Sequence, residues 1–177
     1  MSNSFLSTRP KPDEHIAYYS KYIDRVPDGN IVDTLSRQIP ETIAFLRAIP
    51  DSKADYRYAP EKWSIKEIIG HLADGERVFQ YRAFRFSRGD ATPLPGFDEN
   101  LYVANAPFSR LRMTDLIGDL EHLRRSTIHL FASMEEEAFT RRGVANGDAV
   151  SVRAIAYIMA GHETHHIQVM KERYLNS

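Results

Sequence analysis

Apolar residues recur at helical spacing along most of the chain, and the pattern divides it into segments. The first long segment runs from about Asn30 to Ile49. Its apolar positions are Ile31, Leu35, Ile39, Ile43, Leu46 and Ile49. Pro40 lies inside the pattern and predicts a kink or a break, because proline lacks the amide hydrogen that an interior helical residue donates. Pro50 and Asp51 end the segment.

A second periodic segment follows Ser64. Glu67 comes three residues later, which is the spacing of a capping box, in which each side chain accepts a hydrogen bond from the other residue's backbone amide. This helix is expected to run to about Arg88 and to stop at Gly89. Residues 90–113 then form a connection that is long for a compact domain. It could travel the length of a bundle, so the helices on either side of it could run parallel.

Two further helices complete the pattern. Thr114 is expected to cap one, and Ser151 the last, which spans roughly residues 152–174. Residues 141–150 between them predict a turn or short hairpin. No segment is a confident strand. A short aromatic-rich helix is expected over residues 15–26.

The pattern predicts an all-α fold in a single domain covering residues 1–177. It consists of a four-helix bundle with one long crossover, plus the short N-terminal helix. Residues 1–13 contain two prolines and are expected to form a loosely ordered arm.

Composition narrows the chemistry. A chain of 177 residues can bury a core without a disulfide or a structural metal, so a bound metal would serve function. The absence of cysteine excludes disulfides, thiolate metal sites and a cysteine nucleophile. A net charge of −1 with interspersed acids and bases argues against nucleic-acid binding. No segment suggests export or a membrane span, so a cytoplasmic protein is expected.

Three histidines carry the strongest functional signal. His162 and His166 are spaced i, i+4, which places both rings on one side of the last helix, and His71 lies within the second long helix. Three imidazoles would leave coordination positions free, as in a catalytic metal site. Glu67 and Asp74 flank His71 and are candidates to orient its ring. His165 points about 100° away from His166 and is left out. The alternative is that these are core or solvent-facing histidines without a metal.

The letters HETHH at 162–166 also match the HExxH motif of zinc peptidases, in which Glu163 would be the general base. Only eleven residues follow His166, and Glu172 is the sole carboxylate among them. A third ligand at His71, upstream, fits a helical bundle better than a zinc peptidase.

The sequence resembles the DinB/YfiT-like superfamily of metalloenzymes, in its DinB-like subgroup. The resemblance runs from AYYSKYIDRVPDG through YRYAPEKWSIKEIIGHLADGERVFQYRAFRFSRGDATPLPGFDENLYV to GHETHHIQVM, nearly the whole chain. It implies a bundle in up-down-down-up order and a nickel or zinc ion held by His71, His162 and His166. It also implies a bacterial, cytoplasmic protein that is often a homodimer. Some relatives transfer a low-molecular-weight thiol, and a distant branch isomerises maleylpyruvate with a thiol cofactor.

With no cysteine and no recognisable serine nucleophile, a nucleophile would have to be metal-bound water or an external thiol. The expected function is therefore a divalent-metal-dependent thiol S-transferase or hydrolase acting on a small molecule. The alternatives are a non-catalytic, stress-related metal or small-ligand binding protein and a metal-free helical interaction domain. Residues considered for the substrate side are Trp63, Arg82, Arg85, Phe97 and Tyr102. Trp63 is expected to plug the bundle end rather than wall the site.

Overall fold

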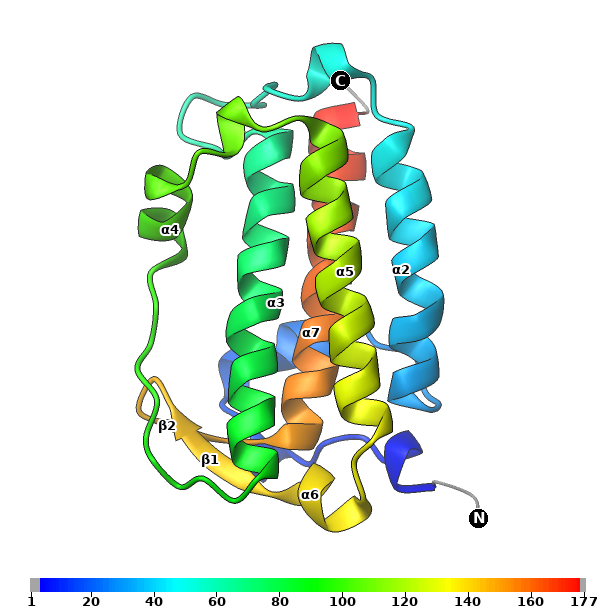
Figure 1. The fold of residues 1–177 in the computed structure, drawn as a ribbon, viewed down its shortest axis with the longest axis vertical. Helices are drawn as coiled ribbons and strands as arrows, with labels where there is room; N and C mark the ends of the chain where they lie inside the picture. The colour runs from blue at the N-terminus through cyan, green and yellow to red at the C-terminus, as the bar shows by residue number, and fades with distance from the viewer. Residues whose placement is uncertain (1–3, 176–177) are drawn as a thin grey trace.

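The computed structural model describes residues 4–175, and four long helices form its body (Figure 1). They are α2 (Ile31–Arg47), α3 (Ile65–Ser87), α5 (Met113–Ala132) and α7 (Val152–Val169), the last continued by a π-helical turn (Met170–Leu175). In Figure 1, α2 and α7 run upward whereas α3 and α5 run downward. The all-α bundle and its up-down-down-up order are therefore confirmed.

Short elements lie at both ends and along one side of the bundle (Figure 1). They are 3-10 turns at Ser4–Ser7, Pro12–Glu14, Ala17–Tyr19, Asp51–Lys53 and Phe108–Arg110, helices α1 (Ser20–Ile23), α4 (Glu99–Asn105) and α6 (Glu136–Thr140), and strands β1 (Arg142–Ala145) and β2 (Asp148–Ser151). The expected hairpin is thus present. Its turn uses Asn146 and Gly147 at φ of 58° and 84°, the left-handed pair that a tight two-residue hairpin requires.

The long connection after α3 explains why α3 and α5 run parallel. Gly89, at φ 77°, ends α3 in the left-handed conformation that favours glycine. The chain then climbs the outside of the bundle through α4 before it enters α5 from above (Figure 1). On the way Leu94 pairs with the hairpin, donating its amide hydrogen to the Val144 carbonyl at 2.9 Å. The crossover is therefore fixed to the bundle at its lower end.

Helix starts largely follow the sequence signals. Ser64 Oγ accepts the Glu67 amide hydrogen at 3.3 Å, and Glu67 Oε2 accepts that of Ser64 at 2.7 Å, so the capping box is confirmed. Ser151 Oγ accepts the Ala154 amide hydrogen at 2.9 Å and caps α7. Thr114 is not a cap, because α5 begins one residue before it, at Met113.

Of the kink or break predicted at Pro40, the break is wrong, because α2 continues through this residue. Ile39 and Ile43, on either side of the proline, both stay buried. Burial of this apolar face on both sides offsets the hydrogen bond that proline removes.

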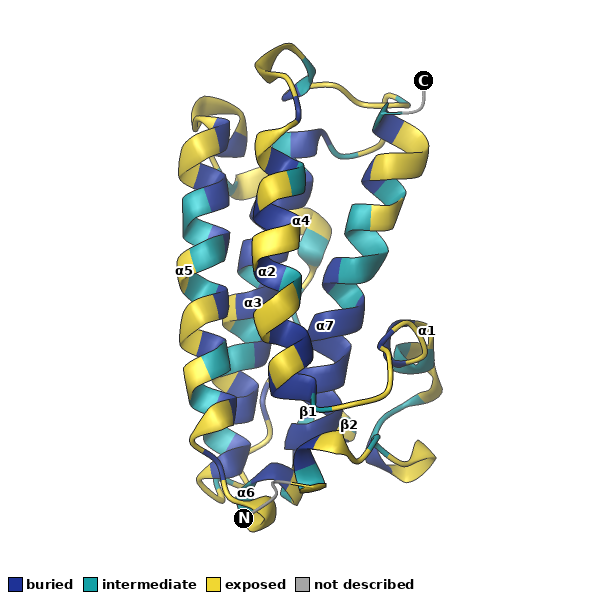
Figure 2. Cartoon of the chain, turned by 90° about the vertical axis from the view of Figure 1, so that its right-hand side faces the viewer, coloured by how far each residue is buried: buried dark blue, intermediate teal, exposed yellow. Residues whose placement is uncertain are grey.

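The core fills the bundle from end to end, and the first ten residues of α7 are all buried (Figure 2).

The loosely ordered arm is a second expectation that the structure corrects, for residues 4–13; residues 1–3 lie outside the described part. Leu6 is 4 % exposed and belongs to the core. Arg9 donates to the carbonyls of Val26 and Ile23 at 2.7 and 2.8 Å. Among the described residues, no helix combines the length and apolar character needed to cross a membrane.

Gly161 should tolerate no larger residue. A Cβ at this position of α7 would overlap the backbone carbonyl of Tyr22, so Gly161→Ala must push the N-terminal segment away from the bundle. We expect a loss of about 1–3 kcal/mol in the free energy of unfolding, measured with urea. The control is Gly118→Ala in α5, where a Cβ meets nothing within 4 Å; it should gain about 0.5–1 kcal/mol. Equal effects of the two substitutions would contradict this packing.

Candidate metal centre

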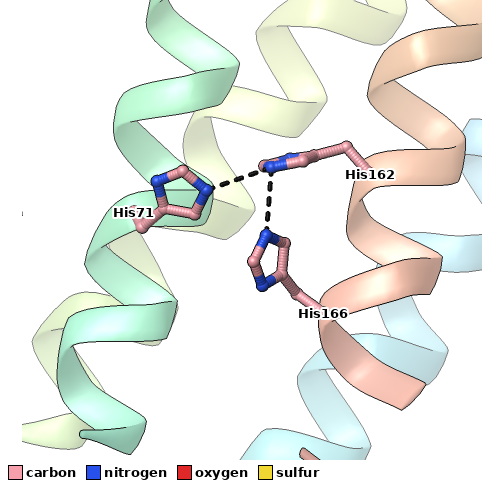
Figure 3. A group of neighbouring side chains, drawn as sticks. All are labelled: His71, His162 and His166. Atoms are coloured by element: carbon pink, nitrogen blue, oxygen red, sulfur yellow. Dashed lines mark hydrogen bonds between the residues drawn. The ribbon is translucent and has the colours of Figure 1, made fainter. Parts of the chain in front are cut away.

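Three histidine rings from two helices meet inside the bundle (Figure 3). His71 projects from α3, while His162 and His166 project from successive turns of α7. The Nε2 atom of His162 lies 3.0 Å from Nε2 of His71 and 3.1 Å from Nε2 of His166. The potential ligand atoms of all three lie within 4.8 Å of one another. The predicted histidines therefore converge, while the bound metal stays a prediction.

The geometry of this cluster suits a divalent ion. Two imidazole nitrogens on a tetrahedral zinc ion, each about 2.0–2.1 Å from the metal, are about 3.3 Å apart. The two Nε2 separations of 3.0 and 3.1 Å are close to that value. Within the described residues no fourth histidine and no carboxylate joins the group. The donor set is thus three imidazoles, with room for further ligands.

Burial keeps these rings neutral. It lowers the pKa of His71 to about 4. The pKa values of His162 and His166 are also well below the ordinary 6.5, first because of burial and then because the neighbouring rings would repel a second positive charge. Near neutral pH each ring therefore has a nitrogen lone pair available for a metal.

Aromatic rings surround the cluster. The centroid of the Trp63 ring lies 4.6 Å from that of His71, and those of Tyr22 and Phe79 lie 5.4 and 6.4 Å from that of His162. Trp63 therefore walls the site, which differs from the plugging role expected for it. Its position follows from the capping box, because Trp63 directly precedes Ser64 at the start of α3.

The cluster opens onto a pocket with a volume of about 490 Å³. Phe97 and Arg82 line this pocket, and Tyr102 packs against Phe97 with 5.3 Å between ring centroids. Arg85 does not line it and pairs instead with Asp90 and Tyr81. His165 lines the pocket but is not part of the three-histidine group.

The two carboxylates expected to orient His71 are engaged elsewhere, which corrects that expectation. Glu67 accepts hydrogen bonds from the Ser64 amide and, at 2.6 Å, from Arg57. Its place in the first turn of α3 directs it back to the unpaired amide at the helix start. Asp74 pairs with Arg77 at 3.4 Å. Neither carboxylate forms a hydrogen bond with His71 in the described part of the chain.

Sequence reasoning missed a buried charge cluster beside the histidines. Arg124 of α5 donates to both carboxylate oxygens of Glu76 at 2.8 and 2.9 Å and pairs with Glu163 at 2.7 Å. Thr42 donates to the other oxygen of Glu163, and Gln38 Oε1 accepts from Arg124 at 3.4 Å. The sequence signal for this cluster is Arg124, a charged residue among the apolar positions of α5. Its partners could not be identified from the sequence because they lie far away along the chain.

The same charge cluster determines the role of Glu163 in the HETHH segment. Glu163 is 1 % exposed and is held by Arg124 and Thr42, away from the three histidines. A zinc-peptidase base must reach a water on the metal. Glu163 is therefore a structural carboxylate. Because its side chain points away from the three histidines, the zinc-peptidase interpretation of HExxH is excluded.

An up-down-down-up helical bundle with an inward-facing three-histidine pocket defines the structural class of this protein. The chain belongs to the DinB superfamily, whose family model matches residues 34–170.

Two curated relatives are similar over most of the chain. A protein from Oceanobacillus iheyensis is 25 % identical over 143 residues, covering 79 % of each chain. A protein from Bacillus pumilus is 23 % identical over 143 residues, covering 80 % of this chain and 81 % of the relative. The names of both propose a metal-dependent hydrolase.

Solved structures share the fold. YfiT from Bacillus subtilis, described as a probable metal-dependent hydrolase with an unusual four-helix bundle topology, matches with a TM-score of 0.72 and 15 % identity. The match covers 98 % of this chain and 97 % of YfiT. A mycothiol-dependent maleylpyruvate isomerase matches with a TM-score of 0.65 and 14 % identity. That match covers 81 % of this chain but 59 % of the isomerase, so the isomerase has a large part without a counterpart here.

The metal-free protein should lose stability as pH falls from about 6.5 to about 4. Below pH 6.5 the unfolded chain protonates His71, whereas the folded protein does so only near its pKa of about 4. His71 alone should contribute about 3 kcal/mol of this loss. Urea unfolding at pH 7 and pH 4 in the presence of a chelator measures this loss of unfolding free energy. His71→Gln should flatten the dependence and the exposed His122→Ala should not; equal slopes in parent and His71→Gln would contradict the prediction.

Removing Arg124 should be far more damaging than removing one of its partners. Arg124→Met leaves two buried carboxylates without a cation, and we expect a loss of about 3–5 kcal/mol in unfolding free energy. Glu163→Gln leaves Arg124 with both hydrogen bonds to Glu76, so its loss should be clearly smaller. Urea denaturation of both variants compares them. A larger loss for Glu163→Gln would show that the cluster is not organised around Arg124.

Proposed function

We propose that this protein is a divalent-metal-dependent enzyme, most simply a hydrolase, that acts on a small molecule. His71, His162 and His166 would hold the ion. The observation that carries the proposal is the convergence of three mutually facing, neutral imidazoles on a pocket of about 490 Å³, with no carboxylate of the described residues in the group. The names of the two curated relatives and the description of YfiT support the hydrolase assignment.

A divalent ion held by three neutral ligands would supply a Lewis acid that activates water or a thiol near neutral pH. The chain's own residues do the rest. The imidazoles add no negative charge to the site, and their burial prevents competing protons from occupying the ring nitrogens near pH 7. Trp63, Tyr22 and Phe79 form the aromatic walls, which would exclude bulk water and pack against an apolar substrate.

Thiol S-transfer is the second candidate. The size of the pocket supports it, because a volume of about 490 Å³ can hold a thiol cofactor as well as a substrate. The likeness in fold to a mycothiol-dependent isomerase is compatible with it. Because the chain has no cysteine, the thiol would come from a low-molecular-weight compound.

Nickel and zinc both suit a nitrogen-only site, since imidazole nitrogen is a favoured ligand of both ions. A non-catalytic metal or small-ligand binding protein would use the same ligands, and turnover is what separates it from an enzyme. A metal-free interaction domain would not explain why three neutral imidazole rings face one another.

Elemental analysis of untagged protein should find close to one nickel or zinc per chain. Single substitutions His71→Ala, His162→Ala and His166→Ala should each lower the metal content at least tenfold, because a two-histidine remnant binds weakly. His165→Ala is the matched control, a pocket histidine outside the group, and should keep the metal. Metal-free parent protein, with all four variants equally stable, would contradict the proposal.

Activity assays then distinguish the hydrolase, the thiol S-transferase and the non-catalytic binding protein. Protein with its metal should hydrolyse small ester, amide or lactam substrates, or consume an electrophile only when a thiol is added. The rate should disappear in His71→Ala and persist in His165→Ala. Metal bound in full with no turnover in either screen would favour the binding protein.

A further inference from the structure

The described part of the bundle buries three arginines, and two of them have carboxylate partners inside the protein. Arg124 is paired with Glu76 and Glu163. Arg153 is paired with Glu14, to which its Nε donates at 3.0 Å. The third, Arg82 of α3, is 4 % exposed, and no carboxylate of the described residues lies within ion-pair distance of it.

Arg82 is therefore a buried cation whose charge no carboxylate of the described residues neutralises. Its Nη2 donates to the Pro95 carbonyl at 3.0 Å, and its guanidinium interacts with the phenol of Tyr19. The rings of Phe79 and Phe97 each lie 5.7 Å from its central carbon. These contacts hold the guanidinium in place but supply no negative charge. Burying a charge without a counter-ion destabilises the folded protein, so we expect such a guanidinium in a pocket to serve the binding of an anion.

The position of Arg82 connects it to the histidines. Both line the same pocket, Arg82 eleven residues beyond His71 on α3, or roughly 16 Å along the helix axis. Gly75 and Phe79 lie between them on the same side of α3. A Cβ at Gly75 would be in ordinary van der Waals contact with the His162 ring at 3.4 Å, so the pocket reaches the surface of α3 beside this ring. Glu99, which also lines the pocket, forms no ion pair with Arg82.

We propose that Arg82 is the binding residue for an anionic group of the substrate, and that the substrate is a small acid with an aromatic or apolar body. The planar guanidinium suits a two-point contact with a carboxylate or a phosphate. The aromatic rings of Tyr19, Phe79 and Phe97 suit the body of the molecule, which would extend from Arg82 toward the histidines. The proposal rests on the proposed function for what happens at the histidines, but anion binding itself requires no metal.

Ligand-observed NMR titration tests it with benzoate, its uncharged analogue benzamide and inorganic phosphate as probes. The protein is used as purified, with its metal content measured, and again after chelation. Benzoate should bind, and benzamide should bind at least tenfold more weakly. Arg82→Met should weaken benzoate binding at least tenfold. Arg82→Lys keeps the charge but not the planar fork and should give an intermediate affinity, which also guards against misfolding of the Met variant.

Arg85→Met is the matched control, an arginine three residues further along α3 that pairs with Asp90 outside the pocket, and should bind benzoate like the parent. Competition by phosphate would support an anion site for phosphorylated substrates; benzoate binding without competition would support a carboxylate site. Equal affinities for benzoate and benzamide, or benzoate binding unaffected by both Arg82 variants, would overturn the proposal.

The metal content separates this result from the proposed function. Benzoate binding that depends on Arg82 in a protein without metal supports the anion site and contradicts only the metal enzyme. A full complement of metal, with benzoate binding insensitive to Arg82, contradicts only the anion site.

Discussion

The bundle is organised around one buried guanidinium. Arg124 on α5 contacts Glu76 on α3, Glu163 on α7 and Gln38 on α2, so each of the four long helices contributes a polar group to one point in the core. Leaving any of these charges unpaired would cost several kcal/mol. The apolar faces could slide or rotate slightly against one another, but this contact defines one rotation for each helix about its own axis.

That constraint also positions the histidines. Successive residues of a helix point about 100° apart. Because Glu163 must face Arg124, His162 on its N-terminal side is turned toward α3, and His166 follows one turn later on the same side. On α3 the same argument applies to Glu76 and His71, which lie on one helix and face α5 and α7 respectively. The charge cluster and the three-histidine cluster are therefore two consequences of the same helix orientations.

Much of this fold could be predicted from the sequence because its signals are local. Helical periodicity, the Ser64 capping box and the length of the crossover lead directly to the bundle and its order, and the i, i+4 spacing identifies the histidine pair. Contacts between distant segments could not be predicted in this way. The Arg124–Glu76 pair spans 48 residues, and Leu6 is buried in a core cluster whose other members lie far from it along the chain. Glu67 shows the limit most clearly, since its position, three residues after Ser64 and four before His71, suited both a helix cap and a partner for His71.

The HETHH segment shows how direction decides chemistry. With its glutamate aimed at the histidines, this motif would place a carboxylate next to a metal and lower the effective positive charge of the site. Here Arg124 and Thr42 hold that carboxylate toward α5 and α2, so it does not join the three rings. The histidine pocket is left with neutral imidazoles, and Arg82 adds a buried positive charge that has no carboxylate partner among the described residues. An anion in such a pocket would be attracted by two groups, the Arg82 guanidinium and any cation held by the histidines. An acidic substrate is therefore the kind of molecule that its electrostatics favour.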